Sequence, residues 1–293
     1  MKIKITADST CDLSEELLAQ WDIALMPMHI LMGEDSYLDG VTIYPADVFA
    51  YVNAGGKMPK SAAANLVEYT EFFEPFAKEC DAVIHISVSS KLSSCFQNAK
   101  LAAGEFENVY VVDSQNICTG QGYLVLKAAK WAADGLLPRN ITMRLQSLAK
   151  RVELSFVLDR LDFMAKSGRC SGVLAFGANI LGIKPMILFK DGEIFSGGVA
   201  RGRQKSFEKA LDLLMTYLAE HNGTPDDYCI TVGYGYDADE GKRLWMQTRA
   251  ALRAKYPGAQ CEVGLLQIGC TIAVHTGPYA LGMGVMRRWK KQG

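Results

Sequence analysis

The stretch Ser87-Val-Ser-Ser-Lys-Leu-Ser-Ser-Cys95 follows a short apolar run and opens into a helical pattern. Two other stretches occupy the same position between an apolar run and a helix, Asp8-Ser-Thr-Cys-Asp-Leu-Ser14 and Asp113-Ser-Gln-Asn-Ile-Cys-Thr-Gly-Gln-Gly122. If the preceding strands are parallel, their carboxyl ends meet at one edge of a sheet, where open α/β folds bind their ligands. Hydroxyl groups and helix N-termini at that edge favour an anion held by neutral donors. The three stretches therefore predict an α/β sheet with an anion-binding edge.

The first half of the chain alternates strand and helix patterns around these stretches. Compact apolar runs predict the strands, and apolar residues at helical spacing predict the helices between them. The predicted strands are 2–7, 23–32, 82–87, 108–112 and 154–158, and the predicted helices are 14–21, 92–104, 122–134 and 139–151. Asp12 and Glu15 fit a capping box at the start of the first helix. The alternation predicts a mostly parallel sheet with helices on both faces.

The second half has a different pattern. Residues 186–195 contain two short strands about Asp191-Gly192, a pair that is typical of a β-hairpin turn. Helices are predicted at 205–220 and 240–255, a strand at 228–234, and a closing pair of strands at 262–267 and 271–275. Hairpins mixed with helices predict an α+β second domain. A chain of 293 residues is long enough for two domains, which we place at 1–166 and 167–293.

The composition excludes several classes of function. There are 31 basic and 32 acidic residues, so no excess of positive charge attracts nucleic acid or an anionic membrane. Neither a run of 18 apolar residues nor an N-terminal signal-peptide pattern occurs, so we expect a cytoplasmic protein with at most transient membrane contact. The eight cysteines include no Cys-x-x-Cys pair and no Cys/His cluster at zinc spacing. This pattern predicts free thiols and no metal site.

Four side chains are candidates for a functional site. Ser93 lies just inside a predicted helix start, where satisfying exposed amides is the alternative role of its hydroxyl. Ser61 lies among small residues that follow Pro59, where the alternative is a loop that enters a helix. Arg169 lies in a glycine-flanked turn near the predicted domain boundary, where an ordinary surface arginine is the alternative. His275 ends a predicted strand before a Gly-Pro turn, where a structural histidine is the alternative.

Familiar active-site signatures are absent from the sequence. It contains no Gly-x-Ser-x-Gly elbow, no Walker A motif and no Gly-x-Gly-x-x-Gly motif. The stretch 172–183 has almost no polar face, so it is either a buried core helix or the border of an apolar cavity.

The hydroxyl-rich stretches and the later turns together resemble the DegV family, the fatty-acid-binding proteins that serve bacterial fatty-acid kinases. The matching blocks occur in the family's order and cover essentially the whole chain. They are Asp8-Ser-Thr10 with Asp12-Leu13, Ile86-Ser-Val-Ser-Ser-Lys-Leu-Ser93 with Gln97-Asn98-Ala99, Val112-Asp-Ser114, Gly120-Gln-Gly122, Gly168-Arg169, Lys184-Pro185, His275-Thr-Gly-Pro278 and Ala280-Leu-Gly282.

In that family an acyl chain lies in a tunnel between an α/β domain and a second α/β domain. The resemblance implies that Ser93 binds the carboxylate together with a Thr-Ser-Gln loop, which aligns with Ser61-Ala62-Ala63, and it adds Ala62 and Thr276 to the ligand-binding positions. Arg169 and His275 would lie near the carboxylate and help to present it to a separate ATP-dependent kinase subunit, which makes the acyl-phosphate. The resemblance thus implies a lipid carrier and not an enzyme, with a long-chain fatty acid as ligand and no cofactor.

The chain departs from the family pattern at four places, while Ser93, Arg169 and His275 are retained. The departures are Ser61-Ala62-Ala63 for Thr-Ser-Gln, Ser167-Gly168-Arg169 for Gly-Gly-Arg, Tyr279 for a small residue, and Leu92-Ser-Ser-Cys95 for Leu-Ser-Gly-Thr.

Two other classes of function stay open. The first is a serine-dependent lipid hydrolase or acyltransferase that uses Ser93 with His275, although no aspartate is evident as the third member of a triad. The second is a binding protein for a small polar anion held by helix N-termini.

Overall fold

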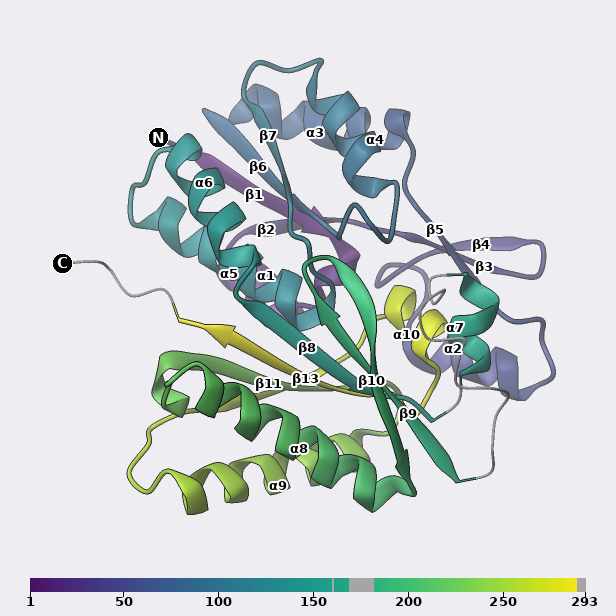
Figure 1. The fold of residues 1–293 in the computed structure, drawn as a ribbon. Coiled ribbons are helices and arrows are strands. Elements are labelled where there is room, and N and C mark those ends of the chain that lie inside the picture. The colour runs from purple at the N-terminus through teal and green to yellow at the C-terminus, as the bar shows by residue number, and fades with distance from the viewer. Residues whose placement is uncertain (160, 169–181, 289–293) are drawn as a thin grey trace. The chain divides into compact units, whose positions relative to one another are not determined.

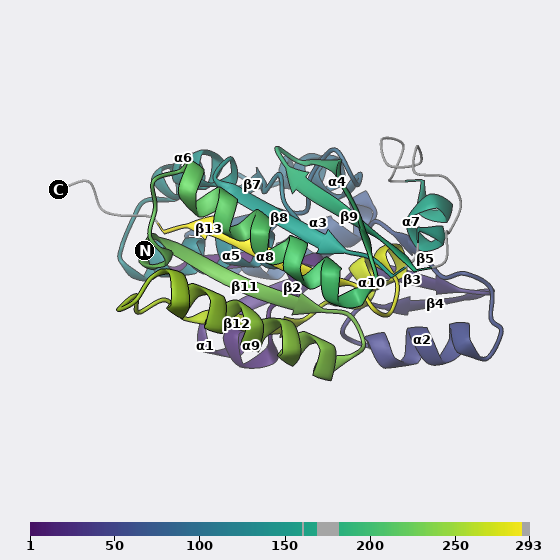
Figure 2. The ribbon, with the colours of Figure 1, turned by 60° about the horizontal axis from the view of Figure 1, so that its bottom comes forward.

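The computed structural model describes residues 1–159, 161–168 and 182–288 (Figures 1 and 2). The chain forms two compact units. The first contains Met1–Lys150, Asp191–Glu193 and Gly269–Ile272, and the second contains Arg151–Lys190, Ile194–Ile268 and Ala273–Gly293. The point between residues 166 and 167, where the sequence places the domain boundary, falls within the second unit, and that boundary stays a prediction.

A four-stranded parallel sheet forms the centre of the first unit. Its strands lie in the order β2-β1-β6-β7, and each neighbouring pair is parallel. The strands are β1 (Ile3–Asp8), β2 (Ile23–Met26), β6 (Ala82–Ser87) and β7 (Val109–Asp113). All residues of β6 are buried, as expected for a strand that is covered on both faces. The predicted parallel sheet is confirmed for these four strands. The strand predicted at 154–158 is wrong as a member of it, because it is β8 (Val152–Val157), which pairs antiparallel with both of its neighbours in the sheet of the second unit.

Helices cover both faces of this sheet. In Figure 1, α3 and α4 lie on one side of it, and α5 and α6 lie on the other. The helices are α1 (Glu15–Gln20), α3 (Leu66–Glu79), α4 (Cys95–Ala103), α5 (Cys118–Ala133) and α6 (Pro138–Ala149). The short 3-10 helix η1 (Ser9–Cys11) links β1 to the segment before α1.

The predicted capping box of Asp12 and Glu15 is wrong. The N-cap of α1 is Ser14, whose hydroxyl accepts from the Leu17 N–H at 3.4 Å. Asp12 instead adopts a left-handed conformation with φ of 50°, and its carboxylate accepts from the distant Gly269 N–H at 3.0 Å. Asp12 therefore binds a distant backbone N–H, which the local sequence does not indicate, and does not cap the helix.

A three-stranded antiparallel sheet, β4-β3-β5, also belongs to the first unit. Its strands are β3 (His29–Met32), β4 (Asp35–Leu38) and β5 (Lys60–Ala62), and α2 (Pro45–Asn53) lies between β4 and β5 in sequence. The prediction of one strand over residues 23–32 is wrong, because β2 and β3 belong to different sheets. Pro27 lies between them and has no N–H to donate to a strand ladder.

The second unit is built on a six-stranded mixed sheet with the order β10-β9-β8-β13-β11-β12. The strands are β8 (Val152–Val157), β9 (Ile183–Lys190), β10 (Glu193–Arg201), β11 (Tyr228–Tyr234), β12 (Val263–Gln267) and β13 (Leu281–Arg287). Helices α8 (Arg203–Glu220) and α9 (Ala238–Lys255) pack on this sheet (Figure 2), with Phe207, Leu214 and Tyr228 in their shared core. The remaining short elements are α7 (Asp162–Ser167) and the 3-10 helix η3 (Pro225–Asp227). This mixed sheet with helices confirms the α+β fold that was predicted for the second half of the chain.

The predicted strand at 271–275 is wrong, because these residues lie in the helix α10 (Cys270–Thr276). Its β-branched residues are typical of a strand, but long-range hydrogen bonds at its N-terminus, described below, favour the helix. The last strand is β13, which the sequence did not predict, since glycines at 282 and 284 weaken a strand pattern. Gly282 is needed there, because a Cβ at this position would lie 2.9 Å from the Phe156 ring on β8.

The described part of the chain contains no helix that is long and apolar enough to cross a membrane. Its cysteines, which exclude Cys170, are free thiols, and most of them are buried. No group of His, Cys, Asp and Glu suited to a metal ion occurs among the same residues.

Candidate functional site

Ser93 lies between the carboxyl end of β6 and the start of α4. It precedes the helix by two residues, so it is not inside the helix as the sequence indicated. Its backbone N–H donates to the Ser89 carbonyl at 3.3 Å. Its Oγ accepts from the Cys95 N–H at 3.3 Å and lies 2.9 Å from the Cys95 Sγ. The half-buried hydroxyl of Ser93 is thus held at the edge of the parallel sheet by the first residue of α4.

Ser61 and Ala62 lie on β5, where they pair with Ile30 and His29 of β3 and are half-buried. The chain then passes through Ala64, whose carbonyl accepts from the Asn98 side chain at 2.8 Å.

The N–H of Ala64 also hydrogen-bonds to the Cys95 sulfur, which is buried. The structure therefore brings the segment that follows Ser61 to the start of α4, where Ser93 is held. Cys95 contacts both candidate segments, although the sequence named it only as a departure from the family pattern.

A buried carboxylate network lies behind Cys95. Asp8, at the end of β1, accepts from the Tyr69 hydroxyl at 2.5 Å, the Ser87 hydroxyl at 2.7 Å and the Val88 N–H at 2.8 Å. The His85 Nε2 lies 3.1 Å from the same carboxylate. Burial by itself would raise the pKa of Asp8, but His85 and the hydrogen bonds outweigh it and hold that pKa below its ordinary value.

This network extends to the Cys95 sulfur. The Thr6 hydroxyl lies 3.1 Å from the His85 Nδ1 on one side, and the Tyr69 hydroxyl makes a hydrogen bond with Cys95 on the other. Sequence analysis missed Asp8, His85 and Tyr69 as parts of the site. The sequence signal for this network was Asp8 at the end of the apolar strand β1 and His85 within the apolar strand β6, since buried polar groups require hydrogen-bond partners.

Two further acids, Asp39 and Asp12, accept hydrogen bonds from the segment at the N-terminus of α10. Asp39 accepts from the Cys270 N–H at 2.9 Å, from the Thr271 N–H at 3.1 Å and from the Thr271 hydroxyl at 2.6 Å. The Ser9 hydroxyl donates to the same carboxylate at 3.1 Å. Carboxylates at this end of a helix satisfy N–H groups that have no partner within the helix.

Asp12 completes this arrangement through the Gly269 N–H. A side chain at 269 is excluded, because its Cβ would lie 2.8 Å from the Asp12 Oδ1. The Asp12 Oδ2 is buried without a hydrogen-bond partner. Burial, together with the nearby Asp39 charge, raises the pKa of Asp12 to about 8 despite hydrogen bonds from Cys118 and Gly269.

His275 and Thr276 lie on the last turn of α10, so His275 does not end a strand as predicted. His275 is half-buried and Thr276 is buried. Gly277 follows with φ of 84°, and this left-handed conformation ends the helix. The first residues of α10 belong to the first compact unit, and His275 and Thr276 belong to the second. Arg169 and most of the apolar stretch 172–183 lie outside the described residues.

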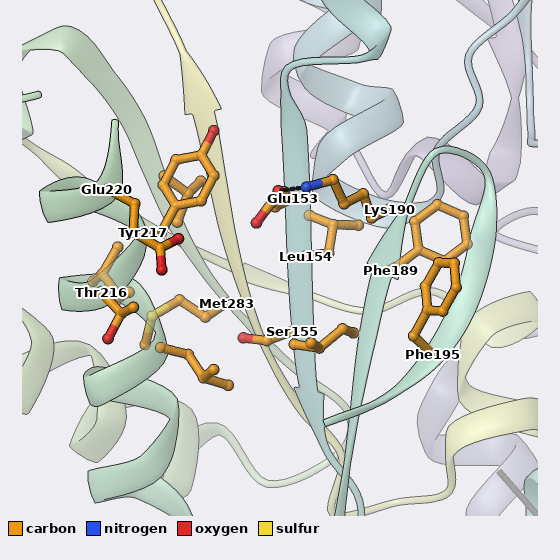
Figure 3. Close-up of a pocket in the computed structure, with 14 residues that line it drawn as sticks. Glu153, Leu154, Ser155, Phe189, Lys190, Phe195, Thr216, Tyr217, Glu220 and Met283 are labelled. Atoms are coloured by element: carbon orange, nitrogen blue, oxygen red, sulfur yellow. Dashed lines mark ion pairs between the residues drawn. The ribbon is translucent and has the colours of Figure 1, made fainter. Parts of the chain in front are cut away.

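An apolar pocket of about 420 Å³ lies within the second unit, between α8 and the strands β8, β9, β10 and β13 (Figure 3). Leu188, Phe195, Leu213 and Met283 are among its lining residues, and so are Glu153 and Lys190, which form an ion pair at 2.6 Å. Its size is typical of small-molecule pockets. None of the candidate residues that the structure describes lines it.

Comparison with known proteins identifies the family. Residues 2–288 match the family described as "Uncharacterised protein, DegV family". The chain belongs to the DegV family. A DegV domain-containing protein of Clostridium perfringens is 32% identical over 279 residues, which cover 94% of this chain and 95% of that protein.

Two solved structures of proteins described as binding a fatty acid share the fold. A DegV family protein from Thermus thermophilus, described as fatty-acid-binding, has a TM-score of 0.87 and 28% identity, covering 98% of this chain and 100% of that one. A stearic-acid-binding protein from Eubacterium ventriosum has a TM-score of 0.88 and 30% identity, covering 97% of this chain and 98% of that one.

We predict that Asp12 makes the stability of this DegV protein depend on pH. Its pKa is raised in the folded state, so the folded protein binds a proton that the unfolded chain has already released above its ordinary pKa of 3.8. The free energy of unfolding should therefore fall as pH rises from about 4 to about 8, by up to ~1.4 kcal/mol per pH unit.

Urea unfolding across this pH window measures the effect. Asp12→Asn should remove much of the slope, because the amide is neutral at every pH and can still accept from Gly269. Asp134→Asn, at an exposed carboxylate after α5, is the matched control and should leave the slope unchanged. An unchanged slope in Asp12→Asn would contradict the prediction.

Proposed function

We propose that this protein binds a long-chain fatty acid and presents its carboxylate to a separate ATP-dependent kinase subunit, which forms the acyl-phosphate. The observation that carries the proposal is the similarity along almost the whole chain to two solved structures, a DegV family protein described as binding fatty acid and a protein described as binding stearic acid. In this proposal the protein is a carrier, and the chemistry takes place on its partner.

The geometry around Ser93 supports an anionic head group bound by neutral donors. A carboxylate accepts hydrogen bonds but cannot donate them, so its site must supply O–H or N–H groups. Ser93 supplies a half-buried hydroxyl at the carboxyl edge of a parallel sheet. Ser61 adds a second hydroxyl, three residues before Ala64, whose backbone contacts the Cys95 sulfur. Ala62 offers only its backbone, so in this chain Ser93 carries most of the side-chain recognition.

The binding energy is compatible with such a sparse polar site. Burying about 15 methylenes at roughly 0.8 kcal/mol each contributes on the order of 12 kcal/mol. Association costs an estimated 4–15 kcal/mol, so the acyl chain can provide the affinity. The head group then has only to avoid the penalty of an unpaired buried charge, for which a few donors suffice.

Presentation to a kinase is assigned to Arg169 and His275. An arginine can neutralise oxygens of the developing acyl-phosphate, and a histidine can donate to it or orient the carboxylate. The anchored N-terminus of α10 supports this role, because Asp39 fixes the helix that carries His275 and Thr276. The tunnel between domains that the resemblance implies stays a prediction.

The first prediction from this proposal concerns the bound ligand. Protein purified from a bacterial host should carry a long-chain fatty acid at near one-to-one stoichiometry, which mass spectrometry after denaturation will identify. Protein that contains no lipid and also fails to bind added fatty acids would contradict it. A bound anion without an acyl tail would instead support the small-anion alternative.

The second prediction separates the two serines. Ser93→Ala should weaken fatty-acid binding by about tenfold, since a hydrogen bond to a charged group is lost. Ser61→Ala should change the affinity much less, because the neighbouring positions Ala62 and Ala63 no longer supply polar side chains. Fluorescent fatty-acid titration measures both variants. Equal affinities of both variants and the wild type would refute the head-group assignment, and steady ester hydrolysis lost in Ser93→Ala would favour a hydrolase.

The third prediction separates binding from presentation. Arg169→Ala and His275→Ala should keep most fatty-acid binding, since apolar burial supplies the affinity. Both should lower acyl-phosphate formation at least tenfold when a cognate kinase subunit and ATP are supplied. Ligand occupancy and coupled turnover are measured on the same preparations. Equal loss of both quantities would place these residues in ligand binding alone, and full activity would remove them from the mechanism.

A further inference from the structure

The apolar pocket of the second unit contains none of the candidate residues that the structure describes, so the proposed function leaves it without a role. Buried residues form its floor, among them Ser155 on β8, Leu214 on α8 and Met283 on β13. Exposed residues, including Lys190 and Phe195, lie at its mouth. The pocket is therefore a hollow whose floor belongs to the core of the second unit and whose mouth reaches solvent.

A hydroxyl group interrupts the apolar floor. Ser155 is only 9% exposed, and its hydroxyl has no hydrogen-bond partner in the part of the chain that the structure describes. Figure 3 shows this hydroxyl directed from β8 toward the wall that α8 forms, into the pocket. A buried hydroxyl without a partner is unfavourable, and such groups are normally paired with protein, water or a ligand. The hydroxyl of Ser155 is thus available to a molecule that enters the pocket.

The charged residues of the lining offer little to a charged head group. The Glu153 carboxylate and the Lys190 ammonium form an ion pair at 2.6 Å, so each neutralises the other. Glu220 is exposed, and water solvates its carboxylate. Tyr217 lies near both Glu153 and Arg287, whose opposite charges shift the pKa of its hydroxyl in opposite directions. The charges around the pocket therefore balance, and they favour neither an anion nor a cation.

We propose that this pocket is a second ligand site, which takes a small uncharged molecule with an apolar body and one hydroxyl or carbonyl oxygen that hydrogen-bonds to Ser155. A serine hydroxyl both donates and accepts, so it can pair with either kind of oxygen. The volume of about 420 Å³ lies toward the lower end of the range for small-molecule pockets, which limits the size of the occupant.

The same chemistry separates this site from the proposed fatty-acid site. A charged head group at the floor would have a single hydroxyl as its partner, and a buried charge with so few partners is unfavourable. The apolar walls, by contrast, stabilise an uncharged body by removing it from water. The second site does not require the proposed function of Ser93.

The test uses three probes that share one alkyl chain and differ in head group, namely 1-octanol, octanoate and octylammonium. Each is titrated into protein loaded with a long-chain fatty acid and into the same protein after removal of lipid. The methionine methyl groups are labelled with carbon-13 for NMR, because Met283 lines the pocket and its signal reports binding there. The variant Met283→Leu assigns that signal.

We expect 1-octanol to shift the Met283 signal with the same dissociation constant in loaded and lipid-free protein. Octanoate and octylammonium should shift it only at concentrations at least about tenfold higher, because their charges are buried without adequate partners. Ser155→Ala should weaken octanol binding about fivefold through the loss of one hydrogen bond. The matched control Thr216→Val removes a hydroxyl from an exposed lining residue and should leave octanol binding unchanged.

Four outcomes would overturn the proposal. They are a Met283 signal that octanol does not shift, equal octanol affinity in Ser155→Ala and the wild type, tighter binding of either charged probe, and competition between octanol and the loaded fatty acid. The last would mean that the pocket holds the acyl chain of the fatty acid and is not a second site. The titration of lipid-free protein tests the pocket even if the protein binds no fatty acid, so failure of the proposed function is distinguished from failure of this site.

Discussion

The buried carboxylate of Asp8 is the interaction on which the first unit depends. It lies at the carboxyl end of β1 and receives hydrogen bonds from Tyr69 on α3, from Ser87 at the end of β6 and from Val88 directly after that strand. A buried charge without partners costs several kcal/mol, so each of these segments is held where the carboxylate needs it. The turn fixed in this way leads directly to Ser93. One acid at a strand end thus couples the sheet to the segment that carries the candidate hydroxyl.

Asp39 performs a similar task for α10. Its carboxylate receives two backbone N–H groups and one hydroxyl from the first residues of that helix. These N–H groups have no partner within a helix, so the acid stabilises a helical start in a segment whose β-branched residues favour a strand. The same acid therefore stabilises the start of the helix on which His275 and Thr276 lie. In both cases a buried acid holds a segment that carries candidate residues and has no direct role with a ligand in our proposal.

In our proposal the head-group site tolerates the loss of polar side chains. In the proposed function the acyl chain supplies most of the affinity, and the head group requires only a few donors. Replacement of the family's Thr-Ser-Gln by Ser61-Ala62-Ala63 removes two polar side chains but leaves the backbone of β5 in its ladder with β3. In our proposal the remaining side-chain recognition depends mainly on Ser93. Asn98 and Cys95 on α4 both contact Ala64, which follows Ser61 and Ala62 along the chain.

The sequence by itself determined the parallel sheet, its helices and the position of Ser93 beside a helix start, because apolar periodicity and strand-end hydroxyls are local signals. It also determined the family, through short blocks in a fixed order. It did not determine the helix at 270–276 or the strand at 281–287, since hydrogen bonds and close contacts between distant residues decide these elements. The break between β2 and β3 was missed although Pro27 is a local signal for it.

The sequence also did not show the hydrogen-bond partners of Asp8, Asp12 and Cys95. Asp12 fitted a local capping box, yet its carboxylate binds the N–H of Gly269, more than 250 residues away along the chain. The sequence fixes which polar groups must find partners when they are buried, but only the tertiary structure decides which partners those are. The physical reason is that a buried polar group is satisfied by whatever donor or acceptor packing brings within about 3 Å, at any separation along the chain.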